Sequence, residues 1–211
     1  MATKAQSKRA ASGTRRLGKD SAAAILDVAE RLVQLRGFNG FSYADVAAEL
    51  KVTKASLHYH FPGKAELGEA LMARYAARFA EALALIESEI PDATARLDAY
   101  ADLYADVLAG RRMCLCGMLA AEYETLSGPL REAVISYFDD NEAWLTRVIE
   151  QGRQDGRLRF DGPATELAQV IVSSLEGAML IARPYDDVER FRTAARRLLA
   201  SLAATAPQPI P

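Results

Sequence analysis

The chain has 211 residues, half of them hydrophobic and about a quarter charged, with a formal net charge of −2. This composition is ordinary for a soluble globular protein of one large or two small domains. No uninterrupted apolar run approaches the roughly 18 residues of a membrane span, and two cysteines are too few for a disulfide framework. We therefore expect a cytoplasmic protein with no membrane partner.

The charge is unevenly distributed along the chain. Residues 1–75 contain 12 Lys or Arg against 7 Asp or Glu, whereas the remainder contains 14 against 21. Residues 1–19 are basic, lack acids and have no apolar stretch, which indicates a disordered basic arm rather than a secretory signal. A basic first third on an acidic remainder favours nucleic-acid binding by the first third alone. The alternative is that the basic excess only solubilises an unstructured tail.

The early part of the chain predicts three short helices in close succession. Residues 21–36 form an amphipathic pattern that ends at Gly37, a typical residue just beyond a helix. Ser42 and Asp45 have the spacing of a capping box, and Thr53 is a good N-cap for a further helix that Pro62 must end. Two short helices joined by a very tight turn and packed on a third describe a helix-turn-helix unit.

A helix-turn-helix inserts the N-terminal part of its second helix into the major groove of DNA. The second helix begins at Thr53 here, so its first exposed side chains are the candidates for base contacts: Lys54, Ala55, Ser56 and His58. The flanking polar residues are predicted to hold phosphates: Ser42, Tyr43, Thr53, Tyr59, His60 and Lys64. His58 and His60 have no Cys or acid at ligand spacing, so we expect no metal site.

Residues 37–71, "GFNGFSYADVAAELKVTKASLHYHFPGKAELGEAL", resemble the DNA-binding domain of the TetR family of bacterial regulators. The resemblance covers about fifty residues, from Ile25 to Tyr75, and is most specific around His60, Phe61 and Lys64. It implies base contacts from the start of the second helix, and phosphate contacts from Tyr59, His60 and Lys64. Two positions depart from the family pattern: Lys51 replaces the usual glycine of the turn, and His58 replaces a tyrosine.

The remaining chain predicts longer helices over residues 92–110, 113–126, 129–156, 163–185 and 187–205. The expected fold class is therefore all-α, with a helix-turn-helix domain (20–75), a larger ligand-binding and dimerisation domain (76–205) and a disordered tail (206–211). The resemblance implies that a penultimate helix around 174–183 pairs with its copy in a homodimer. An apolar stripe on that helix agrees, and we assign the interface to Leu175, Ala178, Met179 and Ala182; burial within one protomer is the alternative.

A ligand-sensing domain requires a cavity with a few polar groups among apolar walls. The candidate lining residues are Tyr104, Cys114, Met118 and Trp144, although such residues often pack as plain core. Cys114 and Cys116 would point to opposite faces of a helix over 113–126, so we expect no bond between them. Arg111, Arg112 and the helix N-terminus would favour a thiolate, which leaves a reactive sensor thiol as an alternative to packing.

The sequence therefore predicts a homodimeric repressor that binds a palindromic double-stranded DNA operator and is released by a small-molecule effector, without a cofactor. One alternative is a redox- or electrophile-sensing repressor that responds through Cys114 or Cys116. A small helical enzyme is a more distant alternative, because the second domain contains no histidine and no evident nucleophile–base pair. We therefore expect no catalytic residues.

Overall fold

The computed structural model describes residues 21–203; the basic arm (1–19) and the tail (206–211) predicted above lie outside this range. The regular elements of the described chain are helices, and its β pairing is limited to an isolated bridge between Leu158 and Ala203, which confirms the all-α fold class. An N-terminal helix (residues 21–36) is followed by these elements: α2 (Tyr43–Leu50), α3 (Lys54–His60), α4 (Lys64–Glu89), α5 (Ala93–Ala109), α6 (Leu115–Ala121), η1 (Tyr123–Thr125), α7 (Gly128–Gln154), α8 (Ala164–Ala182), η2 (Arg183–Tyr185) and α9 (Val188–Ala200).

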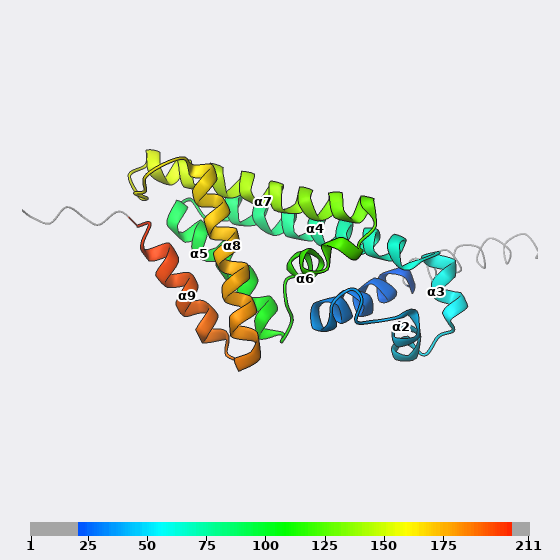
Figure 1. Cartoon of the computed structure of the whole chain (residues 1–211). Helices are drawn as coiled ribbons and strands as arrows, with labels where there is room; N and C mark the ends of the chain where they lie inside the picture. Colours follow the sequence, from blue (N-terminus) through cyan, green and yellow to red (C-terminus); the bar gives the residue numbers. More distant parts are fainter. Residues whose placement is uncertain (1–20, 204–211) are drawn as a thin grey trace, which may run out of the picture.

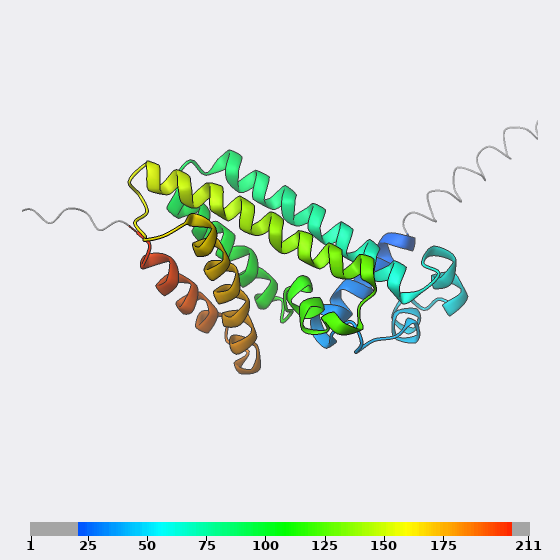
Figure 2. The same ribbon diagram turned by 45° about the horizontal axis from the view of Figure 1, so that its top comes forward.

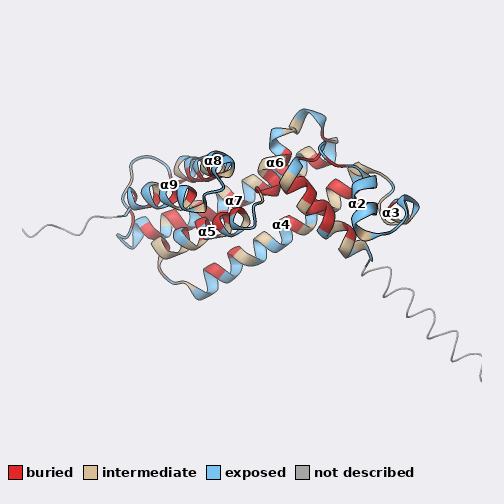
Figure 3. Cartoon of the chain, turned by 90° about the horizontal axis from the view of Figure 1, so that it is seen from below, coloured by how far each residue is buried: buried red, intermediate tan, exposed pale blue. Residues whose placement is uncertain are grey.

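The N-terminal helix, α2 and α3 form a small unit at one end of the elongated molecule, and α9 lies at the other end (Figure 1). The capping signals in the sequence operate as predicted. The Asp45 carboxylate accepts hydrogen bonds from the backbone N–H and hydroxyl of Ser42 at 2.7 and 2.6 Å, and Thr53 Oγ1 accepts from the Ser56 N–H. Leu57 is the buried residue of α3, and the rest of that helix is largely exposed (Figure 3).

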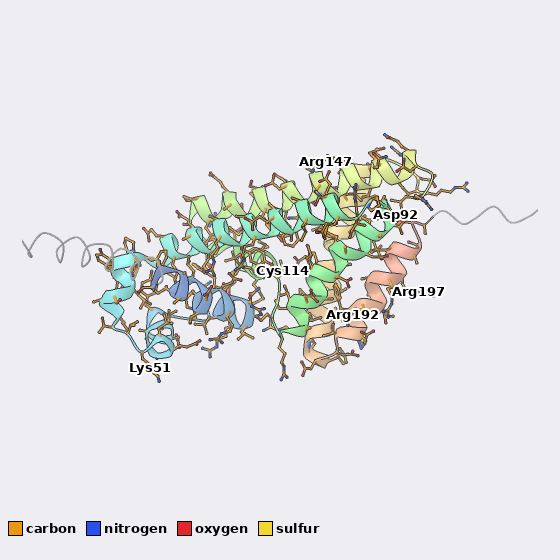
Figure 4. The ribbon with its side chains drawn as sticks, turned by 180° about the vertical axis from the view of Figure 1, so that it is seen from behind. Lys51, Asp92, Cys114, Arg147, Arg192 and Arg197 are labelled. Carbon is orange, nitrogen blue, oxygen red and sulfur yellow. The ribbon has the colours of Figure 1, made fainter. Side chains whose placement is uncertain are left out.

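The turn between α2 and α3 requires a left-handed backbone at Lys51, with φ 56° and ψ 42°. A residue with a Cβ adopts this conformation less readily than glycine, at a cost of about 1 kcal/mol. The turn is nevertheless closed by a hydrogen bond from the Val52 N–H to the Ala47 carbonyl at 3.0 Å. The side chain of Lys51 points away from the ribbon, into solvent (Figure 4).

Helix α4 connects the two parts of the molecule and runs alongside α7 (Figures 1 and 2). Its 26 residues span about 39 Å at 1.5 Å per residue. Inside the larger unit, α4, α5 and α7 enclose a cluster of aromatic rings: Tyr75, Phe79, Tyr100, Tyr104, Tyr137 and Trp144. These rings meet at centroid distances between 5.3 and 6.4 Å, so the interior is densely filled.

The single helix predicted over residues 113–126 is wrong. Helix α6 covers only Leu115–Ala121, a 3-10 turn follows at Tyr123–Thr125, and Cys114 has the extended backbone of a residue before a helix. Long-range contacts explain this: the Met113 N–H donates to the Gln34 carbonyl at 3.2 Å, and the Cys114 N–H donates to Met179 Sδ at 3.3 Å. These contacts fix the segment before α6 in a shape that the local sequence does not specify.

Helix α8 and the turn after it, Ala164–Tyr185, pass a test for a membrane-spanning helix by length and composition, with a mean hydropathy of 1.3. The sequence had suggested no such segment. Core helices of soluble proteins pass the same test, and 33% of the most apolar window is buried in the protomer. Most of that window is therefore not buried, and α8 presents an apolar face to solvent.

A buried ion network fastens the N-terminal helix to α4. Glu30 is buried, and its two carboxylate oxygens accept hydrogen bonds from Arg74 at 2.8 Å and Arg78 at 2.6 Å. Arg74 also pairs with Asp27 at 2.7 Å. A second pair, Arg31 with Glu49, joins the same helix to α2 but is exposed to solvent.

Replacing Glu30 by Gln is predicted to lower the free energy of unfolding by about 2–3 kcal/mol, because Arg74 loses its buried counter-charge while Arg78 remains partly hydrated. Glu49→Gln is the matched control, since it breaks the exposed pair between Glu49 and Arg31 of the N-terminal helix and is expected to cost about 0–1 kcal/mol. Urea denaturation followed by circular dichroism measures both. Equal losses for the two variants would contradict the assignment of the buried network.

Candidate DNA-binding surface and sensing region

Helix α3 presents the predicted base-reading residues on the outside of the molecule. Lys54, Ala55 and His58 are exposed and Ser56 is half-buried. Tyr59 extends furthest, with 84% of its surface exposed although it is aromatic. An exposed short helix with cationic, hydroxyl and aromatic side chains at its surface has the chemistry needed to contact bases and phosphates.

The turn after α3 is held by two side chains that the sequence had assigned to DNA. The Tyr43 hydroxyl lies 2.9 Å from the Phe61 carbonyl and 2.5 Å from the Gly63 carbonyl, and burial raises the pKa of Tyr43 to about 12, with Glu66 adding to the shift. His58 Nδ1 lies 2.9 Å from the Pro62 carbonyl, and its ring packs against Tyr43 at 4.7 Å. Because that carbonyl can only accept, His58 Nδ1 carries a proton. The turn therefore has a fixed conformation.

Lys64 is half-buried at the start of α4. Its Nζ donates to the Phe41 carbonyl at 2.5 Å and lies 4.4 and 5.0 Å from the ring centroids of Phe41 and Phe38. Burial lowers the pKa of Lys64, and the nearby Glu122 and Asp45 oppose this shift. Gly63, the N-cap of α4, has no side chain with which to cap it, so the first N–H groups of this helix are available. Lys64 thus ties α4 to the loop before α2.

Three further residues predicted to contact phosphates surround this surface. Ser42 and Thr53 are exposed at the starts of α2 and α3, where their oxygens also serve as caps. His60 is half-buried, and its ring lies 5.2 Å from that of Tyr59. The structure therefore gathers the ten predicted DNA contacts on α2, α3 and the start of α4, and their contacts with DNA stay a prediction.

The candidate ligand-lining residues are in two different environments. Tyr104 and Trp144 are buried in the aromatic cluster: Tyr104 Oη lies 3.0 Å from Tyr100 Oη, and Trp144 Nε1 donates to Glu87 at 3.2 Å. Met118 instead lines a groove of about 270 Å³ between α6, α7 and α8. The groove is otherwise lined by Met113, Gly117, Ala120, Ala121, Phe138, Glu176, Gly177 and Leu180.

Cys114 and Cys116 are both buried and free, and Cys114 precedes the helix, so the helical spacing assumed for this pair does not hold. The Tyr75 hydroxyl donates to Cys114 Sγ at 3.8 Å, and Cys116 Sγ lies 3.6 Å from Met72 Sδ. Hydrogen bonds from Cys116, Glu176, the Gly117 N–H and Tyr75 lower the pKa of Cys114 to about 6, against the opposing effect of burial. Figure 4 places Cys114 in the middle of the molecule, where the two units meet.

Glu176 is a functional candidate that the sequence analysis did not single out. Burial and the neighbouring Cys114 raise its pKa well above the usual range, and its Oε1 is buried without a hydrogen-bond partner among the described residues. Its carboxyl group lies directly on Gly117, where a Cβ would be 2.4 Å from Oε2. Only the three-dimensional fold brings residues 114, 117 and 176 together, so no local signal marks them.

The segment around Cys114 also contacts the DNA-binding unit directly. Besides the bond from Met113, Arg112 donates to Gln34 Oε1 at 3.3 Å, and Arg183 donates to the Leu35 carbonyl. The Asn39 N–H donates to Glu122 Oε2 at 2.9 Å, and the Asn39 amide to Thr125 Oγ1 at 2.7 Å. We call residues 34–39 and 111–125, with Arg183, the junction.

The predicted interface residues of α8 mostly face inward. Leu175, Met179 and Ala182 are buried in the protomer, and Ala178 is half-buried. The exposed face of α8 instead carries Val170, Gly177, Leu180 and Ile181, followed by Tyr185 of η2. Within residues 21–203, no three His, Cys, Asp or Glu side chains cluster as metal ligands.

Two family models match most of the chain. Residues 25–71 match the model of bacterial regulatory proteins of the tetR family, and residues 93–198 match that of the tetracyclin repressor-like C-terminal domain. The transcriptional regulator LmrA of Bacillus subtilis is 30% identical over 176 residues, which cover 77% of this chain and 86% of LmrA.

Solved structures agree with this relationship. A TetR-family regulator from Agrobacterium tumefaciens superposes with a TM-score of 0.86 and 32% identity, covering 89% of this chain and all of the other. The reduced form of Escherichia coli NemR, a transcriptional repressor, superposes with a TM-score of 0.76 and 26% identity over 90% of this chain and all of NemR. The proteins of this family are regulators rather than enzymes. The chain belongs to the TetR family of bacterial transcriptional regulators.

Proposed function

We propose that the protein is a homodimeric repressor, acting in the cytoplasm, whose operator binding is relieved by a small molecule. The observation that carries this proposal is the exposed surface of α3, on which Tyr59 is 84% exposed. The turn that follows α3 is held in place by Tyr43 and His58. A large aromatic side chain so exposed buries little of its surface within the protomer, and the fixed turn follows directly after its helix. Such preorganisation reduces the cost of ordering the surface on binding.

The division of labour on this surface follows from the internal contacts. Lys54, Ala55 and Ser56 are assigned to base edges, because they occupy the exposed start of α3. Tyr59, His60, Thr53 and Ser42 are assigned to phosphates. Tyr43, His58 and Lys64 already bond to backbone carbonyls, so we assign them mainly to holding the α3–α4 turn and the loop before α2.

A dimer supplies the second half of the reading surface. Two copies of α3 in successive major grooves need a separation of about 34–36 Å, which one protomer cannot provide. The exposed face of α8 carries apolar or small residues, and Val170, Gly177 and Ile181 follow one another on it at helical intervals. This face is suited to packing against its own copy, and its exposure also accounts for the apolar character of α8 without a membrane.

The effector signal is proposed to pass through the junction. The groove beside Met118 and Glu176 adjoins α6, and the segment before α6 bonds to the end of the N-terminal helix. A molecule that displaces this segment changes the angle of the DNA-binding unit relative to α8. It relieves repression only to the extent that it binds the displaced arrangement more tightly.

A second candidate function is a thiol-sensing repressor, favoured by the cluster around Cys114. The aromatic rings between α4, α5 and α7 are packed against one another. Cys114, whose pKa is lowered to about 6, instead lies next to Glu176, which lines the groove. A thiolate at neutral pH reacts with electrophiles and oxidants far faster than a thiol does. NemR, which is known in a reduced form, is a repressor of similar structure.

The first test measures operator binding by fluorescence anisotropy with DNA flanking the gene. Lys54→Ala is expected to cost about 1–3 kcal/mol on the operator and to relax preference at one base pair. Tyr59→Phe removes a phosphate contact, so it is expected to weaken binding by a similar factor on all sequences. Weak, salt-sensitive binding by the parent protein, equal on operator and competitor DNA, would overturn the proposed function.

The dimer face is tested by Ile181→Glu, which places a charge at the centre of the exposed stripe and is expected to produce monomers. Leu85→Glu is the matched control, because Leu85 has a similar exposed fraction, 55% against 58%, but lies on α4. Sedimentation velocity distinguishes the two oligomeric states. A dimer that survives Ile181→Glu, or that is lost equally in Leu85→Glu, argues against the α8 interface.

The thiol-sensing candidate predicts that alkylation of Cys114 by iodoacetamide accelerates through about pH 6 and then levels off. Cys116→Ala should shift this profile to higher pH, since it removes the largest cause of the lowered pKa. The same reagent should release the parent protein from DNA but leave Cys114→Ser bound. If Cys114→Ser is released as readily as the parent, the thiol has no sensing role.

A further inference from the structure

The sulfur atoms of the described chain converge on one place. Met113, Cys114, Cys116 and Met118 lie within six consecutive residues. The remaining two described methionines, Met72 of α4 and Met179 of α8, are buried against the same segment. Cys116 Sγ lies 3.6 Å from Met72 Sδ, and the Cys114 N–H lies 3.3 Å from Met179 Sδ. Cys114, Cys116, Met72 and Met179 thus form a buried cluster, whereas Met118 is half-buried and contacts Arg183.

The contacts in this cluster have the form of a ligand set. A metal–thiolate bond is about 2.3 Å long, so two sulfurs sharing one cation lie roughly 3.8–4.6 Å apart. The separation of Cys116 Sγ and Met72 Sδ, 3.6 Å, is within a few tenths of an ångström of that range, and Cys114 lies two residues away in the same buried segment. Small rotations of the flexible Met72 side chain suffice to open the site.

We propose that Cys114 and Cys116, supported by the Met72 thioether, bind a soft monovalent cation, Cu⁺ or Ag⁺. Thiolate and thioether sulfur prefer such ions, which accept two or three ligands. Structural zinc instead requires four ligands from Cys, His or carboxylates, and among residues 21–203 no such group of three is present. The inference concerns binding itself, and rests on the proposed function only where operator release is concerned.

The surroundings of the cluster accommodate the charge that binding creates. Binding displaces the thiol protons of Cys114 and Cys116 to solvent and leaves two thiolates around one cation, a net charge of −1. The Tyr75 hydroxyl donates to Cys114 Sγ at 3.8 Å, and a hydrogen bond to a charged acceptor stabilises that charge. Met113, which precedes Cys114, bonds to Gln34, so closing the two thiols on a cation would pull directly on the junction.

The test is anaerobic competition for Cu⁺ between the reduced full-length protein and the chromophoric chelator bicinchoninate. The parent is expected to withdraw one equivalent per protomer, and Cys114→Ser and Cys116→Ser to withdraw none. Met72→Leu keeps the side-chain volume but removes the thioether, and is expected to bind at least about tenfold more weakly. Met118→Leu is the matched control, because Met118 contacts Arg183 rather than the thiols and should leave binding unchanged.

X-ray absorption at the copper edge of the loaded parent protein keeps the inference testable if a cysteine variant fails to fold. A shell of two or three sulfurs is expected; nitrogen or oxygen ligands, or no withdrawal of Cu⁺ from the chelator, would overturn the proposed site. Operator binding by the metal-free protein is measured separately. If the metal-free protein does not bind the operator, the proposed function is contradicted but the metal site is not. If the protein does not capture Cu⁺, the metal site is contradicted but the proposed function is not.

Discussion

The arrangement of the molecule depends on the junction, where the end of the N-terminal helix is held by backbone and side-chain hydrogen bonds from residues remote in sequence. Gln34 is a buried polar residue, and its carbonyl and amide oxygens are satisfied by Met113 and Arg112. A buried acceptor without its donor costs about 1–3 kcal/mol, so these bonds are maintained or exchanged together. The junction is therefore a rigid connection between the DNA-binding and larger units, and α4 is a second connection running parallel to it.

The interior of the larger unit contrasts with this polar junction. Tyr75 and Tyr137 fill space between α4 and α7, and the hydroxyl of Tyr137 is buried without a hydrogen-bond partner among the described residues. A buried hydroxyl without a partner lowers stability, so the aromatic cluster is close-packed at the cost of one unmade hydrogen bond. Other polar groups of the interior are paired: the Tyr100 hydroxyl lies 3.0 Å from that of Tyr104 and 3.2 Å from Asn141 Oδ1.

Local signals were sufficient to predict the DNA-binding unit. The Ser42–Asp45 and Thr53 caps act between residues three apart, and the position of Lys51 in a tight turn follows from the spacing of α2 and α3. Such features are encoded by neighbours in sequence, which is why α2 and α3 have the predicted boundaries.

Non-local contacts account for what sequence reasoning could not predict. The extended backbone of Cys114 depends on Gln34 and Met179, which lie far away in the chain, and the contact of Cys116 with Met72 is equally remote in sequence. The roles of Tyr43 and His58 in the α3–α4 turn likewise require knowledge of where the Phe61, Pro62 and Gly63 carbonyls point. Residue type had indicated that these side chains form hydrogen bonds, but could not identify the partner.

Gly37 has a consequence for how the protein can be recombined with its relatives. Its backbone has φ 89°, and a Cβ on it would lie 2.3 Å from Glu122 Oε1, the carboxyl group that also binds the Asn39 N–H. The glycine and the acid are 85 positions apart in the sequence, yet the Glu122 carboxyl group fills the space that a side chain at position 37 would need. A chimaera that joins this DNA-binding unit to the helical body of another regulator must therefore inherit both residues, so the boundary between exchangeable modules crosses the chain twice rather than once.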